Sequence, residues 1–156
     1  MFRGRSIHSL DNKGRLAIPA RFRDVLKGYN DERLMVTNRD RCLVAYPYDG
    51  WREIEQQFAV LSITQPAVLR YQRVFISGAM ECACDKQGRI LIPQELRMRA
   101  GLEGDPDSQE EANNQVVLVG MLNSFEIWSK PRWDQEDAKN LEEFDSLSQV
   151  MADKGM

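Results

Sequence analysis

Two short segments of the sequence carry an aspartate and an arginine four residues apart, with a glycine just before the arginine. They are Asp11–Arg15 and Asp85–Arg89, with Gly14 and Gly88 as the glycines. A glycine at this point suits a tight turn, because it adopts positive φ without a steric penalty. An aspartate before a turn can accept hydrogen bonds from backbone N–H groups. We therefore expect both aspartates and both glycines to shape turns.

The arginines of these segments have two possible roles. Arg15 and Arg89 could fold back onto their own aspartates as exposed ion pairs, worth about 0–1 kcal/mol each. They could instead project toward nucleic acid, because arginine makes bidentate contacts with guanine in the major groove. The nearby Lys13 and Lys86 would then contact phosphates, which position a protein on DNA without reading its sequence.

Charge is distributed unevenly along the 156-residue chain, although its formal net charge is only −3. Residues 1–27 hold seven basic and two acidic residues, whereas residues 134–156 hold seven acidic and two basic ones. Arg3 and Arg5 belong to the basic end, and they would share a face with Arg15 if the strands on either side of the first turn pair. A basic end suits an anionic partner such as DNA, and two solvated faces are the alternative interpretation.

The two turn segments belong to a repeat that spans the chain. Residues 10–19 align with residues 84–93 at an offset of 74, and Asp, Gly, Arg, Ile and Pro are identical at matching positions. Farther on, residues 43–51 resemble residues 125–133 at an offset of 82, and a polar insertion at Asp105–Gln115 accounts for the difference. Such self-similarity indicates two copies of one structural unit.

We assign the first copy to residues 1–65, the second to residues 66–146, and an acidic, flexible tail to residues 147–156. Helices are expected at 20–27, 51–61, 94–100 and 133–144, a short helix from Pro66, a strand at 74–76, and second hairpins at 34–37 with 42–46 and at 116–119 with 125–128. An isolated two-stranded hairpin is marginal in water, so the two copies should bury their apolar faces against each other. The sequence thus predicts an α+β fold with a small interleaved β-core and pseudo-twofold symmetry.

The sequence offers few candidate residues for catalysis or metal binding. His8 is the only histidine, and Cys82 and Cys84 lack a second pair of zinc ligands. We see no Walker motif and no Ser-His-Asp candidate set. We therefore expect that the protein is not an enzyme and that it binds no metal, cofactor or small-molecule substrate. No apolar stretch reaches the roughly 18 residues of a membrane span. The N-terminus lacks the apolar segment of a secretory signal, so we expect a cytoplasmic protein.

The opening Met1–Gly4, the two Asp-x-x-x-Arg elements and the Gly-Arg-x-x-Ile-Pro continuation of each resemble the MraZ family, which belongs with the SpoVT/AbrB-type swapped-hairpin transcription factors. The segments Leu118–Gly120 and Phe125–Trp128 extend the resemblance over nearly the whole chain. It implies a duplicated swapped-hairpin β-barrel with short flanking helices, in which the two motifs interleave.

The resemblance also implies a sequence-specific DNA-binding regulator, with repression favoured. It would bind short direct repeats upstream of the cell-division and cell-wall gene cluster, including its own gene, as a ring-shaped homo-oligomer associated with the nucleoid. The family's key arginine corresponds to Arg15 and the second motif's to Arg89. The expected DNA-contacting residues are Arg3, Arg5, Lys13, Arg15, Lys86 and Arg89. The alternative is an oligomeric protein-interaction scaffold that does not bind DNA and whose turns only stabilise the fold.

The second turn has fewer basic neighbours than the first. Ser77, Ala79 and Glu81 stand where the first copy has Arg3, Arg5 and Ile7. The second motif could therefore contact DNA, or it could serve the fold or a subunit interface.

Overall fold

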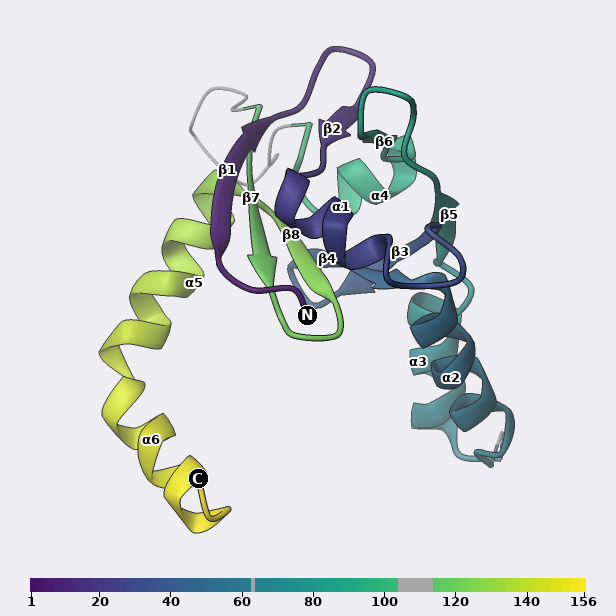
Figure 1. The fold of residues 1–156 in the computed structure, drawn as a ribbon. Coiled ribbons are helices and arrows are strands. Elements are labelled where there is room, and N and C mark those ends of the chain that lie inside the picture. The colour runs from purple at the N-terminus through teal and green to yellow at the C-terminus, as the bar shows by residue number, and fades with distance from the viewer. Residues whose placement is uncertain (63, 104–113) are drawn as a thin grey trace.

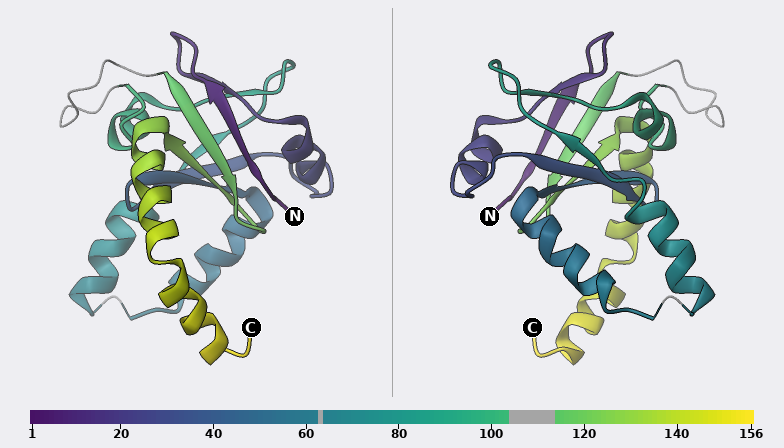
Figure 2. Two further views of the ribbon diagram at one scale, coloured as in Figure 1. Left: turned by 90° about the vertical axis from the view of Figure 1, so that its left-hand side faces the viewer. Right: turned by 90° about the vertical axis from the view of Figure 1, so that its right-hand side faces the viewer.

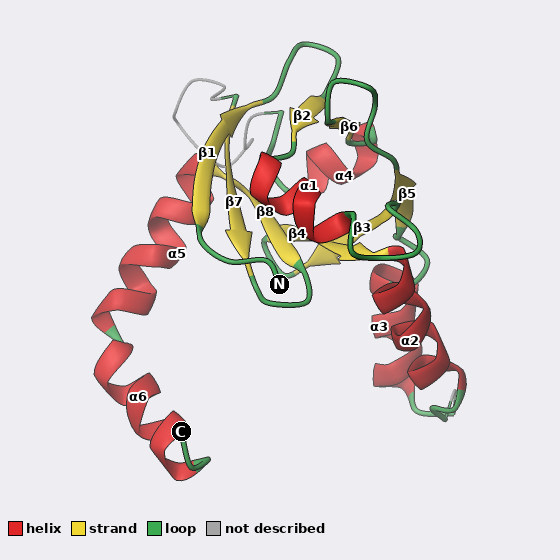
Figure 3. Cartoon of the chain, viewed as in Figure 1, coloured by secondary structure: helices red, strands yellow, loops and turns green. Residues whose placement is uncertain are grey.

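The computed structural model describes residues 1–62, 64–103 and 114–156 as a mixed α+β fold (Figures 1 and 3). The strands are β1 (Arg5–Ser9), β2 (Arg15–Ala17), β3 (Leu34–Arg39), β4 (Cys42–Pro47), β5 (Met80–Cys82), β6 (Arg89–Leu91), β7 (Gln115–Gly120) and β8 (Phe125–Ser129). The helices are α1 (Ala20–Leu26), α2 (Tyr48–Ala59), α3 (Pro66–Phe75), α4 (Gln94–Arg99), α5 (Lys130–Glu142) and α6 (Phe144–Asp153). The α+β prediction is confirmed.

Six strands form an antiparallel sheet in the order β1-β7-β8-β4-β3-β5, and β2 pairs with β6 in a separate two-stranded sheet. The predicted second hairpin of each copy is confirmed as β3–β4 and β7–β8. The first strand of each copy, however, pairs with the third strand of the other copy, as β1 with β7 and β5 with β3. The two copies therefore exchange strands.

Two ladders pair residues with their own equivalents in the repeat. Leu16 lies opposite Ile90, 74 positions later, and Val44 lies opposite Glu126, 82 positions later. Antiparallel pairing centred on equivalent residues is what a twofold relation between the copies produces. Leu16 and Ile90 are both fully buried, so this ladder gives two marginal three-residue strands a shared apolar face.

The main core draws on both copies, as predicted. Phe2 and Phe22 from the first copy meet Phe125 from the second, with ring centroids 5.1–5.3 Å apart. Two smaller clusters lie outside this core, one around Trp51 and Phe75 under α2 and α3, and one around the tryptophans of β8 and α5. Aromatic contacts of this kind stabilise by about 0.5–1.5 kcal/mol beyond their buried area.

The structure corrects three expectations. The six-stranded sheet ends at β1 and β5, so the described residues form an open sheet and no closed barrel. The strand expected at 74–76 is wrong, because Val68, Gln72 and Phe75 lie on one inward face of α3 and helical spacing prevails over β-branched composition. The segment after Ser146 was expected to fray, yet it continues as α6, although no α6 residue is buried.

The helices extend from the sheet region as two legs, α2–α3 and α5–α6, on opposite flanks of the molecule (Figures 1 and 2). Both legs project away from the loops that carry residues 11–15 and 85–89. None of the described helices is long and apolar enough to cross a membrane. The polar insertion at Asp105–Gln115 lies almost wholly outside the described residues.

Candidate nucleic-acid interface

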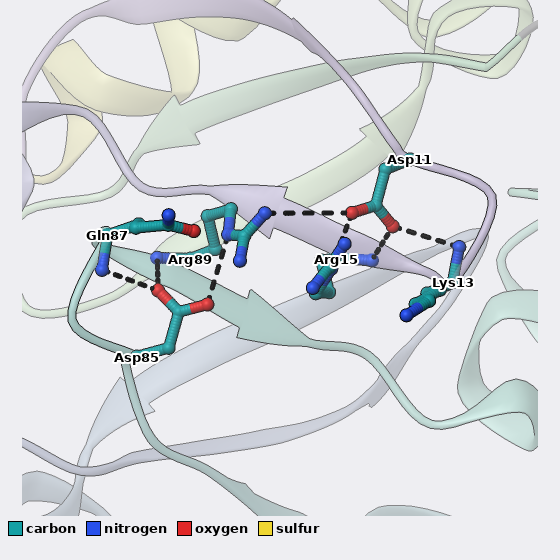
Figure 4. A network of polar contacts seen from close by, with 6 residues as sticks. All are labelled: Asp11, Lys13, Arg15, Asp85, Gln87 and Arg89. Carbon is teal, nitrogen blue, oxygen red and sulfur yellow. Dashed lines mark hydrogen bonds and ion pairs between the residues drawn. The ribbon is translucent and has the colours of Figure 1, made fainter.

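The first turn is closed by its own aspartate (Figure 4). The Asp11 Oδ1 accepts hydrogen bonds from the backbone N–H groups of Lys13 and Arg15, both at 2.9 Å. The Gly14 N–H donates to the Asp11 carbonyl at 3.0 Å, and Gly14 has a φ of +82°. The turn therefore needs glycine at this point and an acceptor side chain at Asp11.

The second turn repeats this arrangement 74 residues later. The Asp85 Oδ1 accepts from the N–H groups of Gln87 at 2.9 Å and Arg89 at 3.0 Å. Gly88 has a φ of +72° and donates to the Asp85 carbonyl at 3.0 Å. We refer to residues 11–15 and 85–89 together as the turn crest.

Each turn is supported by a helix from the other copy. Arg97 of α4 lies against Gly14 and donates from Nη1 to the Ile92 carbonyl at 2.5 Å. Arg23 of α1 lies against Gly88 in the same way and donates to the Ile18 carbonyl at 2.8 Å. These two supports were missing from the expected site residues, although Arg23 and Arg97 occupy equivalent positions of the repeat. The crest is thus a cross-braced surface rather than two separate loops.

The guanidinium groups fold back onto their own carboxylates. Arg15 Nε lies 2.5 Å from Asp11 Oδ2, and Arg89 Nε lies 3.0 Å from Asp85 Oδ2. The ion-pair interpretation therefore holds for both turns of the crest. Both arginine side chains remain about one-third exposed, at 32 % and 29 %.

The two arginines differ in what else they contact. Arg89 Nη1 also lies 4.0 Å from Asp11 Oδ2, so Arg89 reaches the carboxylates of both turns (Figure 4). The Nη atoms of Arg15 have no hydrogen-bond partner among the described residues. Lys13 and Lys86 are exposed and form no ion pair with another described side chain. Four cations against two carboxylates leave the crest positively charged, and Arg15 is the arginine better placed to exchange partners.

Arg5 does not join Arg15, because β1 pairs with β7 instead of β2. Its Nη1 lies 3.1 Å from Asp137 Oδ1, and its guanidinium stacks on the Trp133 ring at 4.8 Å. Arg3 is exposed beside it, and the guanidinium of Arg21 donates to the backbone carbonyls of Arg3 and Arg5 at 3.3 and 2.9 Å. The single patch expected for Arg3, Arg5 and Arg15 is therefore divided. Arg15 belongs to the turn crest, whereas Arg5 lies at the start of β1 and faces α5.

Hydrogen bonding lowers the pKa of the Asp11 carboxyl from 3.8 to about 2, chiefly through the Arg15 N–H and then through the Arg15 side chain. The pKa of Asp85 is also lowered, chiefly by the Arg89 N–H. A carboxyl whose pKa falls on folding stabilises the fold above its unfolded pKa and loses that effect as the pH drops through its folded pKa.

We therefore expect Asp11→Asn to lower the melting temperature at pH 7. The difference from the original protein should shrink as the pH falls from about 4 toward 2. Thermal unfolding followed by circular dichroism across this range is the measurement. Asp24→Asn, which changes an exposed carboxylate on α1, is the matched control. A difference that stays constant down to pH 2 would contradict the role given to the charge of Asp11.

The cysteines are placed as packing residues. Burial raises the pKa of the Cys42 thiol well above its usual range and that of Cys82 to about 12. Within the part of the chain that the structure describes, no three histidine, cysteine or acidic side chains gather as a metal site. The geometry offers the crest as the candidate site.

Comparison with known proteins places this sequence in a family. The family model described as "MraZ protein, putative antitoxin-like" matches twice, over residues 1–74 and 75–154. A protein named "Transcriptional regulator MraZ" from Desulforapulum autotrophicum is 44% identical over 137 residues, covering 88% of this chain and 86% of the relative. Proteins of the same name from Syntrophobacter fumaroxidans and Clostridium beijerinckii are 42% and 39% identical, covering 99% and 100% of this chain and 97% and 100% of their own lengths. With two adjoining family matches over residues 1–74 and 75–154, and relatives that cover 88–100% of its length, the chain belongs to the MraZ family.

Proposed function

We propose that this protein is a sequence-specific DNA-binding transcriptional regulator, and that the turn crest is the surface that contacts DNA. The observation that carries the proposal is the pair of braced Asp-x-x-x-Arg turns at one end of the molecule, which between them carry four cations. The names of the relatives support a role in transcription. A two-stranded β-ribbon fits the major groove, which is about 12 Å wide.

Within this proposal Arg15 reads base edges, because its Nη groups can turn to guanine while Asp11 still holds the turn through the backbone. Lys13 and Lys86 neutralise phosphates, and Arg89 contributes mainly by aligning the two turns. Arg3 and Arg5 add positive charge beside the crest; Arg5 would have to leave Asp137 to contact a phosphate. The exchange of strands between copies supports a swapped-hairpin arrangement of the AbrB type.

We further propose a cytoplasmic, nucleoid-associated homo-oligomeric ring that represses transcription from short direct repeats upstream of cell-division and cell-wall genes, including its own. One crest with a few phosphate contacts binds weakly at physiological salt. Several crests on one rim gain affinity through effective concentration when the DNA repeats match their spacing.

The test is fluorescence anisotropy with labelled DNA from upstream of the protein's own gene, and with a shuffled sequence of the same composition, at two salt concentrations. We expect tighter binding to the upstream DNA and at least about a tenfold loss of affinity between roughly 50 and 200 mM salt, since each neutralised phosphate releases counterions. Absent or salt-independent binding to both DNAs would favour the interaction scaffold instead, whereas equal, salt-dependent binding to both would overturn the sequence specificity.

A further inference from the structure

The C-terminal helix α6 exposes an apolar stripe. Phe144, Leu147 and Met151 recur at intervals of three and four residues, the spacing of one helix face. Phe144 is 61 % exposed, and Leu141 at the end of α5 extends the stripe. No α6 residue is buried among the described residues. A contiguous apolar stripe rimmed by polar residues marks an interaction surface.

A second exposed apolar surface lies on the other leg. Tyr71 and Val74 of α3 are 50 % and 47 % exposed, and they lie on the same face of the helix as Ala67. The Tyr71 ring stacks on Phe58 of α2, with centroids 5.7 Å apart, so α2 holds this face in place. This surface is comparable in length to the α6 stripe.

The two helices themselves carry opposite charges. Helix α3 carries Arg70 and Arg73 and no carboxylate, whereas α6 carries Asp145 and Asp153 and no cation. Two apolar stripes of similar length, one with a basic rim and one with an acidic rim, are complementary. Two α6 helices placed together would instead bring like charges into contact.

The two surfaces lie on opposite flanks of one chain, so their natural partners are on separate molecules (Figures 1 and 2). We propose that α6 of one copy docks on the Arg70–Val74 face of α3 in the next copy. The contact is head-to-tail, so each chain uses its α6 on one neighbour and its α3 on the other. This inference rests on the proposed ring and identifies the contact between its neighbouring subunits. Since both legs project away from the turn crest, the crests of all copies stay free on one rim.

The experiment uses two full-length variants, each of which lacks one half of the joint. In the first, Arg70→Ser and Val74→Ser remove the α3 face. In the second, Phe144→Ser and Leu147→Ser remove the α6 stripe. Light scattering coupled to size exclusion should give the original chain as a multimer and each variant alone as a monomer of 18.0 kDa. An equal mixture of the two should form a heterodimer, because α6 of the first variant can dock on α3 of the second. The heterodimer should not grow further, because its two remaining surfaces are the substituted ones.

Several outcomes would overturn the proposal. They are a monomeric original protein, a variant that keeps the original size, a first variant that dimerises through its intact α6, or a mixture that stays monomeric. Circular dichroism of each variant checks the fold, and Met98→Ser, an equally exposed apolar change on α4, should leave assembly unchanged. The anisotropy assay reports the crest separately. A monomer that still prefers the upstream DNA overturns the docking alone, and a multimer that ignores DNA overturns the function alone.

Discussion

Replacing Arg15 by alanine is expected to abolish binding to the upstream DNA while the fold and the assembly stay intact. The loss follows because Arg15 has the only crest guanidinium that contacts a single carboxylate among the described residues. One bidentate arginine–guanine contact is worth about 1–3 kcal/mol, or roughly 5- to 150-fold in affinity, and several copies on one DNA multiply the effect. The measurement is fluorescence anisotropy with the upstream and shuffled DNAs.

The fold should survive because the first turn does not depend on the arginine side chain. The Asp11 Oδ1 accepts from the backbone N–H groups of Lys13 and Arg15, and alanine keeps both donors. The lost ion pair is partly exposed and contributes at most about 1 kcal/mol. Arg52→Ala on α2, which also removes one exposed positive charge, is the matched control and should bind DNA almost normally. Unchanged binding by Arg15→Ala at moderate salt would remove Arg15 from the proposed site.

The same substitution in the second copy distinguishes the roles of the two motifs. Arg89 reaches the carboxylates of both turns, so Arg89→Ala should loosen the crest as well as lower its charge. We expect a lower melting temperature than for Arg15→Ala and a smaller loss of preference for the upstream sequence. A larger loss of sequence preference with an unchanged melting temperature would make Arg89 the principal reader.

The second large effect is expected for Gly14→Ala. The new Cβ would lie 2.0 Å from Nη1 and 2.6 Å from Cζ of Arg97, at a backbone φ of +82°. Left-handed backbone costs a non-glycine residue about 1–2 kcal/mol. Moving Arg97 would also break its bonds to the Ile92 carbonyl and to Glu103. We expect a loss of about 2–4 kcal/mol in the free energy of unfolding, measured by urea denaturation.

Two further variants isolate the cause of that loss. Gly50→Ala lies in α2 with nothing within 4 Å of the new Cβ, so it should stabilise by about 0.5–1 kcal/mol through helix propensity. Combining Gly14→Ala with Arg97→Ala removes the clash, so the double variant should lose less than the sum of the single variants. Strictly additive losses would show that Arg97 does not brace the first turn.

Local patterns in the sequence predict most individual elements. Pro19 and Pro93 mark the starts of α1 and α4, and the apolar runs around the second hairpins match β3–β4 and β7–β8 within two residues. The internal repeat also predicts a core shared by both copies, because neither copy alone could bury its strands. These features depend on neighbouring residues or on composition, which a single sequence displays directly.

Pairing between distant segments could not be predicted in the same way. The assumption that strands on either side of Gly14 pair placed Arg5 beside Arg15, whereas β1 pairs with β7 and Arg5 contacts Asp137. Short strands of similar composition satisfy several pairings equally well, and only packing of the whole molecule selects among them. The supports from Arg23 and Arg97 depend on the same exchange, so they become visible only when the two copies are assembled.

The exchange of strands also determines when the chain can fold during synthesis. Arg5 pairs with Val119, so β1 has no partner until more than 100 further residues have left the ribosome. At about 5–20 residues per second, this wait lasts about 5 to 20 s. The nascent first half carries unpaired apolar strands throughout that interval, which exposes it to aggregation. A chain released before residue 115 would lack a partner for β1, so truncated products should be degraded and should not accumulate as half-length competitors.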